Sequence, residues 1–126
     1  MKIYLSYANM DFELANRVKS ELRKLNHEII LINRTENLFI DVASVSLEEI
    51  KSSDLILFIL TDNSNNSNWI SIELTASVKR HKNIIGIKFD DSVLSEELIF
   101  SLGSATVINE HSFKRNISKF ISIIEG

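Results

Sequence analysis

Cysteine is absent from this chain of 126 residues. Its absence excludes disulfide bonds, catalysis by a thiolate and zinc sites ligated by cysteine. Glycine is scarce as well, because Gly86, Gly103 and Gly126 are the full set. No glycine-rich loop therefore exists to cradle a phosphate, and the common mononucleotide and dinucleotide fingerprints are missing.

Long apolar runs and an excess of positive charge are missing too. The longest apolar run, residues 55–60 (LILFIL), is far shorter than the roughly 20 residues that span a bilayer. The net charge is -3, and the basic residues are spread among acidic ones. We therefore expect neither a nucleic acid nor a membrane as a partner. The lack of cysteine and of a signal-peptide pattern in residues 1–6 predicts a cytoplasmic protein.

The composition that remains is typical of one globular domain. Hydrophobic residues make up 44% of the chain and charged residues 25%, which favours a folded protein over a disordered one. The length suits a single core, so we expect one domain over residues 1–126.

Apolar patterns of two kinds alternate along the chain. Short β-prone runs predict strands at residues 3–7, 27–32, 55–60, 83–89 and 105–108. Helical spacing predicts helices between and after them, with caps at Asn9 or Asp11, at Ser67 or Asn68, and at Ser112. The run at 55–60 has no polar alternation, as expected for a central strand covered on both faces. The alternation predicts an α/β fold, a flavodoxin-like three-layer sandwich with a five-stranded parallel sheet and helices on both faces.

Ligands of such sheets bind beyond the carboxyl ends of the strands. Ser6 and Tyr7 end the first predicted strand, and Arg34 follows the second, where it could meet a phosphate or a partner's carboxylate. Ser67 begins the helix after the third strand, and the amino terminus of that helix could hold an anion. The three histidines have no neighbours that predict acid–base catalysis, and the sequence holds no metal-ligation motif.

Trp69 and Glu73 stand four residues apart in the helix that follows the third strand. This spacing places the two side chains on one side of the helix, roughly 5–6 Å apart at the β-carbons. A flat stacking surface and a carboxylate together could form a binding site. The same pattern also fits a surface helix with a tryptophan at its rim and a solvated glutamate.

Two stretches together resemble the Toll/interleukin-1 receptor (TIR) domain, especially its bacterial branch. Residues 3–11 (IYLSYANMD) are similar to the family's first box, a strand followed by Ser-Tyr and an aspartate. Residues 53–60 (SDLILFIL) and 67–74 (SNWISIEL) are similar to the second box, with its Ser-x-Trp-x-x-x-Glu-Leu pattern. The resemblance covers nearly the whole chain. It departs at the loop of residues 33–39, which lacks a glycine often found there, and at Gly86, where proline is usual.

The resemblance implies an enzyme that cleaves the nicotinamide–ribose bond of NAD, as a glycohydrolase or an ADP-ribose cyclase. By position, Glu73 is the expected catalytic residue, and Trp69, Ser6 and Tyr7 are expected to bind substrate. Arg34 and Ser67 are also expected to bind substrate, because of their places beyond the strand ends described above. NAD is then a substrate, and no cofactor or metal is expected. The resemblance also implies a role in anti-phage defence signalling, self-association through TIR–TIR contacts that complete the site, and a separate sensor or effector protein as a partner.

Two other functions remain open. The chain could be a non-catalytic TIR interaction module that recruits other TIR domains through the loop of Arg34. It could also be an enzyme similar to the nucleoside deoxyribosyltransferases, which share a related α/β fold and use a glutamate at a ribose carbon.

Overall fold

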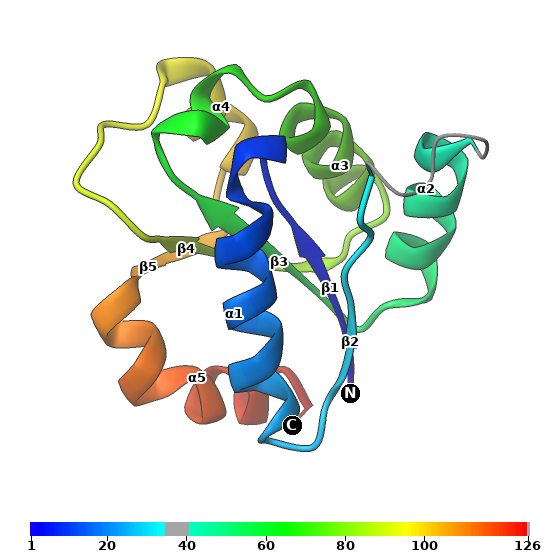
Figure 1. The fold of residues 1–126 in the computed structure, drawn as a ribbon, viewed down its shortest axis with the longest axis vertical. Helices are drawn as coiled ribbons and strands as arrows, with labels where there is room; N and C mark the ends of the chain where they lie inside the picture. Colours follow the sequence, from blue (N-terminus) through cyan, green and yellow to red (C-terminus); the bar gives the residue numbers. More distant parts are fainter. Residues whose placement is uncertain (35–40, 126) are drawn as a thin grey trace.

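The structure is a computed structural model that describes residues 1–34 and 41–125. Within these residues, five parallel strands form one sheet in the order β2-β1-β3-β4-β5 (Figure 1). The strands are β1 (Lys2–Ser6), β2 (Glu28–Ile30), β3 (Leu55–Leu60), β4 (Asn83–Lys88) and β5 (Thr106–Asn109). The helices are α1 (Phe12–Arg23), α2 (Val42–Ser52), α3 (Asn68–Lys79), α4 (Glu96–Leu102) and α5 (Glu110–Glu125). The predicted α/β, flavodoxin-like fold is confirmed.

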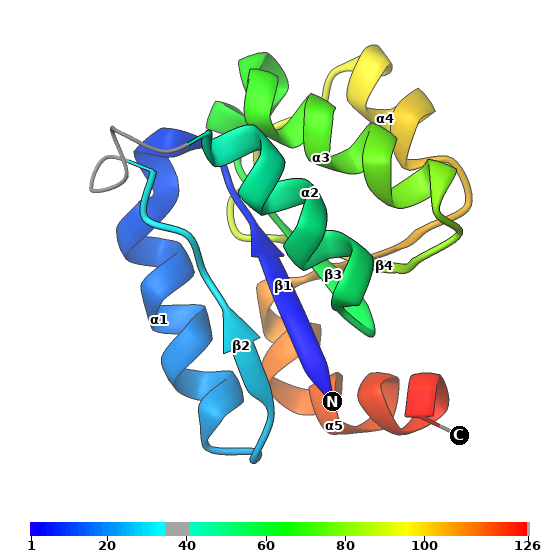
Figure 2. The same ribbon diagram turned by 90° about the vertical axis from the view of Figure 1, so that its right-hand side faces the viewer.

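The helices cover the two faces of the sheet in separate layers. Helices α1 and α5 pack on one face, and α2, α3 and α4 pack on the other (Figure 2). Strand β3 lies in the middle of the sheet, and all of its residues are buried. The unbroken apolar run of β3 is explained by this position, because both of its faces meet a helix layer.

Strand β1 divides its side chains between the two layers. Ile3 and Leu5 belong to the core under α1 and α5, whereas Tyr4 points into the core under α2 and α3. Ser6 follows Tyr4 by two residues, so it lies on the same face of the sheet. The carboxyl end of β1 thus presents two hydroxyl groups toward α3.

The predicted caps have mixed outcomes. Ser67 caps α3 as predicted, because its Oγ accepts a hydrogen bond from the Ile70 backbone N–H at 3.1 Å. Asp11 precedes α1, but its carboxylate accepts hydrogen bonds from Thr61 Oγ1 at 2.6 Å and from the Asn63 side chain at 2.9 Å, so it does not cap the helix. Thr61 and Asn63 in the β3–α3 turn thus bind the Asp11 carboxylate in place of the backbone of α1.

The other differences lie at the ends of elements. Helix α5 begins at Glu110 instead of near Ser112, since Asn109 Oδ1 accepts a hydrogen bond from the Ser112 N–H at 2.8 Å. Strand β2 (Glu28–Ile30) is shorter than the strand predicted at residues 27–32. The loop predicted after the second strand lies mostly outside the described residues. No helix in the described ranges has the length and apolar character that crossing a membrane requires.

Candidate active site

Glu73 is a buried acid on the sheet-facing side of α3. Its exposed fraction is 0%, and its neighbours Ile70, Leu74 and Ser77 on the same side are buried too. The alternative of a solvated glutamate on a surface helix is therefore wrong. A buried carboxylate is costly unless nearby groups donate hydrogen bonds to it.

Four side chains among the described residues donate to this carboxylate. Ser6 Oγ lies 2.7 Å and Arg34 Nη2 lies 3.0 Å from Oε1. Tyr4 and Ser46 donate their hydroxyl groups to Oε2. The donors come from β1, α2 and the segment after β2, so three parts of the chain converge on one residue of α3.

Arg34 lies between two aromatic rings. Its guanidinium carbon is 4.3 Å from the centre of the Tyr7 ring and 4.6 Å from the centre of the Trp69 ring. Nη1 also donates to the Tyr7 backbone carbonyl and to Asn9 Oδ1, at 2.9 Å in both cases. The residue is only 8% exposed, so the ring faces attract the cation with little competition from water.

One polar atom of Arg34 is left over. Its Nε is buried and has no hydrogen-bond partner among the described residues. A buried donor without a partner lowers the stability of the folded protein. Arg34 therefore differs from a structural arginine whose donors are all satisfied.

Burial sets the protonation of the two tyrosines. It raises the pKa of Tyr4, and the adjacent negative charge of Glu73 raises that pKa further. Burial likewise raises the pKa of Tyr7. Both phenols therefore keep their protons, so Tyr4 donates to Glu73 and Tyr7 donates to the Ile32 carbonyl.

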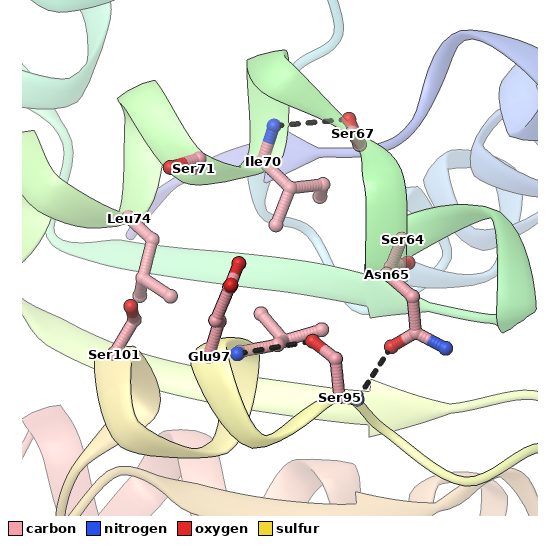
Figure 3. Close-up of a pocket in the computed structure, with 10 residues that line it drawn as sticks. Ser64, Asn65, Ser67, Ile70, Ser71, Leu74, Ser95, Glu97 and Ser101 are labelled. Carbon is pink, nitrogen blue, oxygen red and sulfur yellow. Dashed lines mark hydrogen bonds between the residues drawn. The ribbon is translucent and has the colours of Figure 1, made fainter.

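Ser67 differs from the other residues that the sequence singles out. Ser6 and Arg34 contact Glu73, and Tyr7 and Trp69 contact Arg34. The Ser67 hydroxyl instead caps α3. Ser67 also lines a small cavity of about 60 Å³ between α3 and α4, bordered by Ser71 and Glu97 (Figure 3). The binding and catalytic roles of all these residues stay predictions.

Sequence reasoning missed Tyr4 and Ser46. Tyr4 had a signal, because it precedes Ser6 by two residues in a strand and so shares its face. Ser46 had none, since its contact depends on how α2 packs. Asn9 was expected as a possible cap, and in the structure its side chain accepts a hydrogen bond from Arg34. Within residues 1–34 and 41–125, no three histidine, aspartate or glutamate side chains are grouped so as to hold a metal ion.

Comparisons with known proteins agree with this architecture. The TIR domain family model matches residues 3–120. The TIR domain of the Toll-related receptor TRR-2 from Hydra magnipapillata has a TM-score of 0.78 at 14% identity, and the match covers 98% of each chain. The CMP N-glycosidase BcmB from Clostridium botulinum has a TM-score of 0.59 at 16% identity, covering 96% of this chain and 98% of that one. At these identities the two structures show a shared fold. A search of curated proteins found no match. The match to the family model over nearly the whole chain shows that this protein belongs to the TIR-domain family.

Proposed function

We propose that this protein cleaves the bond between nicotinamide and ribose in NAD and that Glu73 is its catalytic residue. The observation that best supports this is the buried Glu73 carboxylate, which accepts hydrogen bonds from Ser6, Tyr4 and Ser46 and pairs with Arg34. Membership of the TIR family adds support, because the family includes enzymes that cleave NAD.

One carboxylate suffices for this reaction. Glycosidases usually need a second carboxyl group to protonate a poor leaving group. In NAD, the bond between ribose C1′ and the pyridinium nitrogen breaks with its electron pair going to the nitrogen, so nicotinamide leaves as a neutral molecule. Water then adds to C1′ and releases a proton, giving ADP-ribose. If an adenine nitrogen adds instead, the product is a cyclic ADP-ribose.

The carboxylate acts on the charge that develops on the ribose. Two unit charges about 4 Å apart attract by roughly 4 kcal/mol at an effective dielectric constant of about 20. Stabilisation of this size in the transition state corresponds to roughly a thousandfold in rate. The hydroxyl groups of Ser6, Tyr4 and Ser46 hold the carboxylate in one orientation, which reduces the reorganisation needed during the reaction.

The aromatic residues supply surfaces for the nicotinamide ring. Trp69 and Tyr7 already hold a flat cation between them in the form of Arg34. A pyridinium ring is also flat and cationic, so the same faces suit it. Self-association, a sensor or effector partner and a role in anti-phage defence are parts of the proposal that rest on the TIR family alone.

The experiment is mass spectrometry of NAD incubated with concentrated protein. Glu73→Gln keeps the size of the side chain and removes its charge, so we expect nicotinamide release to fall roughly a thousandfold. Glu48→Gln is the matched control, because Glu48 is exposed on α2 and should leave the rate unchanged. Circular dichroism of each variant checks the fold. Equal turnover in wild type and Glu73→Gln, or no turnover in the concentrated wild type, would contradict the proposal.

A second candidate is cleavage of another N-glycosidic bond. The fold similarity to a CMP N-glycosidase favours this candidate. The candidate includes the deoxyribosyltransferase alternative, because those enzymes also break an N-glycosidic bond. The cytosine base of CMP is uncharged, so it must take up a proton to leave as a neutral molecule, whereas the nicotinamide ring of NAD is already cationic and needs no proton. Incubation with CMP and with mixed deoxynucleosides in the same assay separates these reactions from NAD cleavage. A non-catalytic interaction module would instead bind other TIR domains equally well after Glu73→Gln.

A further inference from the structure

Arg34 occupies a position that is suited to a flat cation. Two aromatic faces flank its guanidinium, at 4.3 Å for Tyr7 and 4.6 Å for Trp69, and the Glu73 carboxylate lies 3.0 Å from Nη2. These three groups would attract a planar cation. The oxidised nicotinamide ring of NAD is such a cation, whereas the reduced ring is neutral.

We propose that Arg34 is an internal competitor of the substrate, and that the pyridinium ring enters between Tyr7 and Trp69 only after the guanidinium has left. The identity of the competing ring rests on the proposed function above. The competition itself rests on the contacts of Arg34.

The surroundings of Arg34 allow it to leave. The residue follows β2 (Glu28–Ile30) and belongs to no strand or helix, so its movement breaks no hydrogen-bond ladder. Its buried Nε lacks a partner among the described residues, so departure also relieves an unsatisfied donor. Asn9 is exposed, and water can replace the hydrogen bond that it receives.

The carboxylate remains supported when Arg34 leaves. Ser6, Tyr4 and Ser46 still donate to its two oxygens. The negative charge that paired with the guanidinium then becomes available to the incoming cation. In this exchange the pyridinium ring replaces the guanidinium beside Glu73. While Arg34 is in place, Glu73 is shielded from water.

Trp69 permits a direct binding test, because it is the single tryptophan of the chain. The probe is 1-methylnicotinamide, a pyridinium cation that quenches indole fluorescence when it stacks. We expect saturable quenching in Arg34→Ala with a dissociation constant at least tenfold lower than in wild type. Neutral nicotinamide should show no such difference between the two proteins. An equal or weaker affinity in Arg34→Ala would overturn the inference and would instead indicate that Arg34 helps to bind the ring.

Three further variants control for indirect effects. Arg17→Ala removes an exposed arginine of α1 and should bind like wild type. The double variant Arg34→Ala/Glu73→Gln lacks the attracting charge and should lose most of the gained affinity. If Arg34→Ala fails to fold by circular dichroism, Arg34→Lys replaces it, because it keeps the charge and removes the flat stacking group. We expect a smaller gain in affinity for Arg34→Lys, and no gain would overturn the inference.

Turnover of NAD distinguishes this inference from the proposed function. If both hold, Arg34→Ala consumes NAD faster than wild type at low protein concentration. If no protein consumes NAD but 1-methylnicotinamide binds more tightly to Arg34→Ala, the proposed function fails and the competition stands. If wild type consumes NAD and Arg34→Ala loses both binding and turnover, the proposed function stands and the competition is wrong.

Discussion

Tyr4 has two functions in the site, as a core residue and as a donor to Glu73. It is fully buried beneath α2 and α3 and its hydroxyl group donates to Oε2. Burial raises its pKa first, and the charge of Glu73 does so next. Ionised Tyr4 would place a second negative charge against Glu73, which explains why the phenol must stay neutral for the site to persist.

Alkaline pH should therefore destabilise the protein through Tyr4. In the unfolded chain the phenol has its ordinary pKa of 10.0, and in the folded protein the pKa is higher. The stabilising effect is complete below the unfolded pKa and is lost as pH rises above it, because only the unfolded state releases the proton. We expect the unfolding free energy to fall by up to about 1.4 kcal/mol per pH unit more steeply in wild type than in Tyr4→Phe.

Urea unfolding at several pH values between about 9 and 11 measures this difference. The two proteins differ in this one phenol, so the difference in slope reports Tyr4. Absorbance at 295 nm provides an independent reading, since Tyr4 should ionise only when the circular dichroism signal is lost. Tyrosinate absorbance from both tyrosines near the ordinary pKa in a folded protein would show that Tyr4 is not protected.

Helix α3 positions both residues of the Trp69–Glu73 pair. Its first turn is fixed by Ser67, whose Oγ accepts from the Ile70 N–H. Trp69 follows directly and faces Arg34, and Glu73 lies one turn later against β1. The cap therefore sets where the indole and the carboxylate stand relative to the sheet.

Removing this cap should weaken the helix by a known amount. We expect Ser67→Ala to lower the unfolding free energy by about 1 kcal/mol, and Ser67→Thr to restore most of it because threonine can also cap. Chemical denaturation measures both. The KM for NAD tests the separate expectation that Ser67 binds substrate, because an unchanged KM in Ser67→Ala would assign Ser67 to capping alone.

Strand β4 carries a departure from the TIR pattern. Gly86 pairs with Phe58 of β3 and Val107 of β5. A β-carbon at this position would lie 2.9 Å from Leu60 Cδ1. A larger residue there would therefore require the end of the Leu60 side chain to shift.

At the scale of the whole molecule, the inference about Arg34 makes the form with Arg34 on Glu73 the resting form. TIR-domain enzymes are expected to complete their sites by self-association, so contacts between copies would favour the form in which Arg34 has left. We expect the NAD-cleaving activity per molecule to rise with protein concentration in wild type and to depend much less on it in Arg34→Ala. Sedimentation velocity at the same concentrations shows whether copies associate. Activity per molecule that stays constant while copies associate would contradict this expectation.

Local pattern was enough to predict the layers of this fold. The buried run at β3 and the alternation of strands and helices give the parallel sheet, because period and burial are properties of neighbouring residues. The shared side of Trp69 and Glu73 follows from helical spacing in the same way. The exact ends of α4, α5 and β2 could not be predicted from the local pattern, since they depend on hydrogen bonds and packing beyond it.

Tertiary packing alone determines which side chains contact Glu73. Arg34 is 39 positions away in the chain, Ser46 is 27 and Tyr4 is 69. Tyr4 lies within β1, Ser46 lies within α2 and Arg34 follows β2. The contacts that they make with Glu73 exist only after the crossovers bring these parts of the chain against α3. Whether an acid is solvated or buried depends on donors from distant elements, and no local pattern records them.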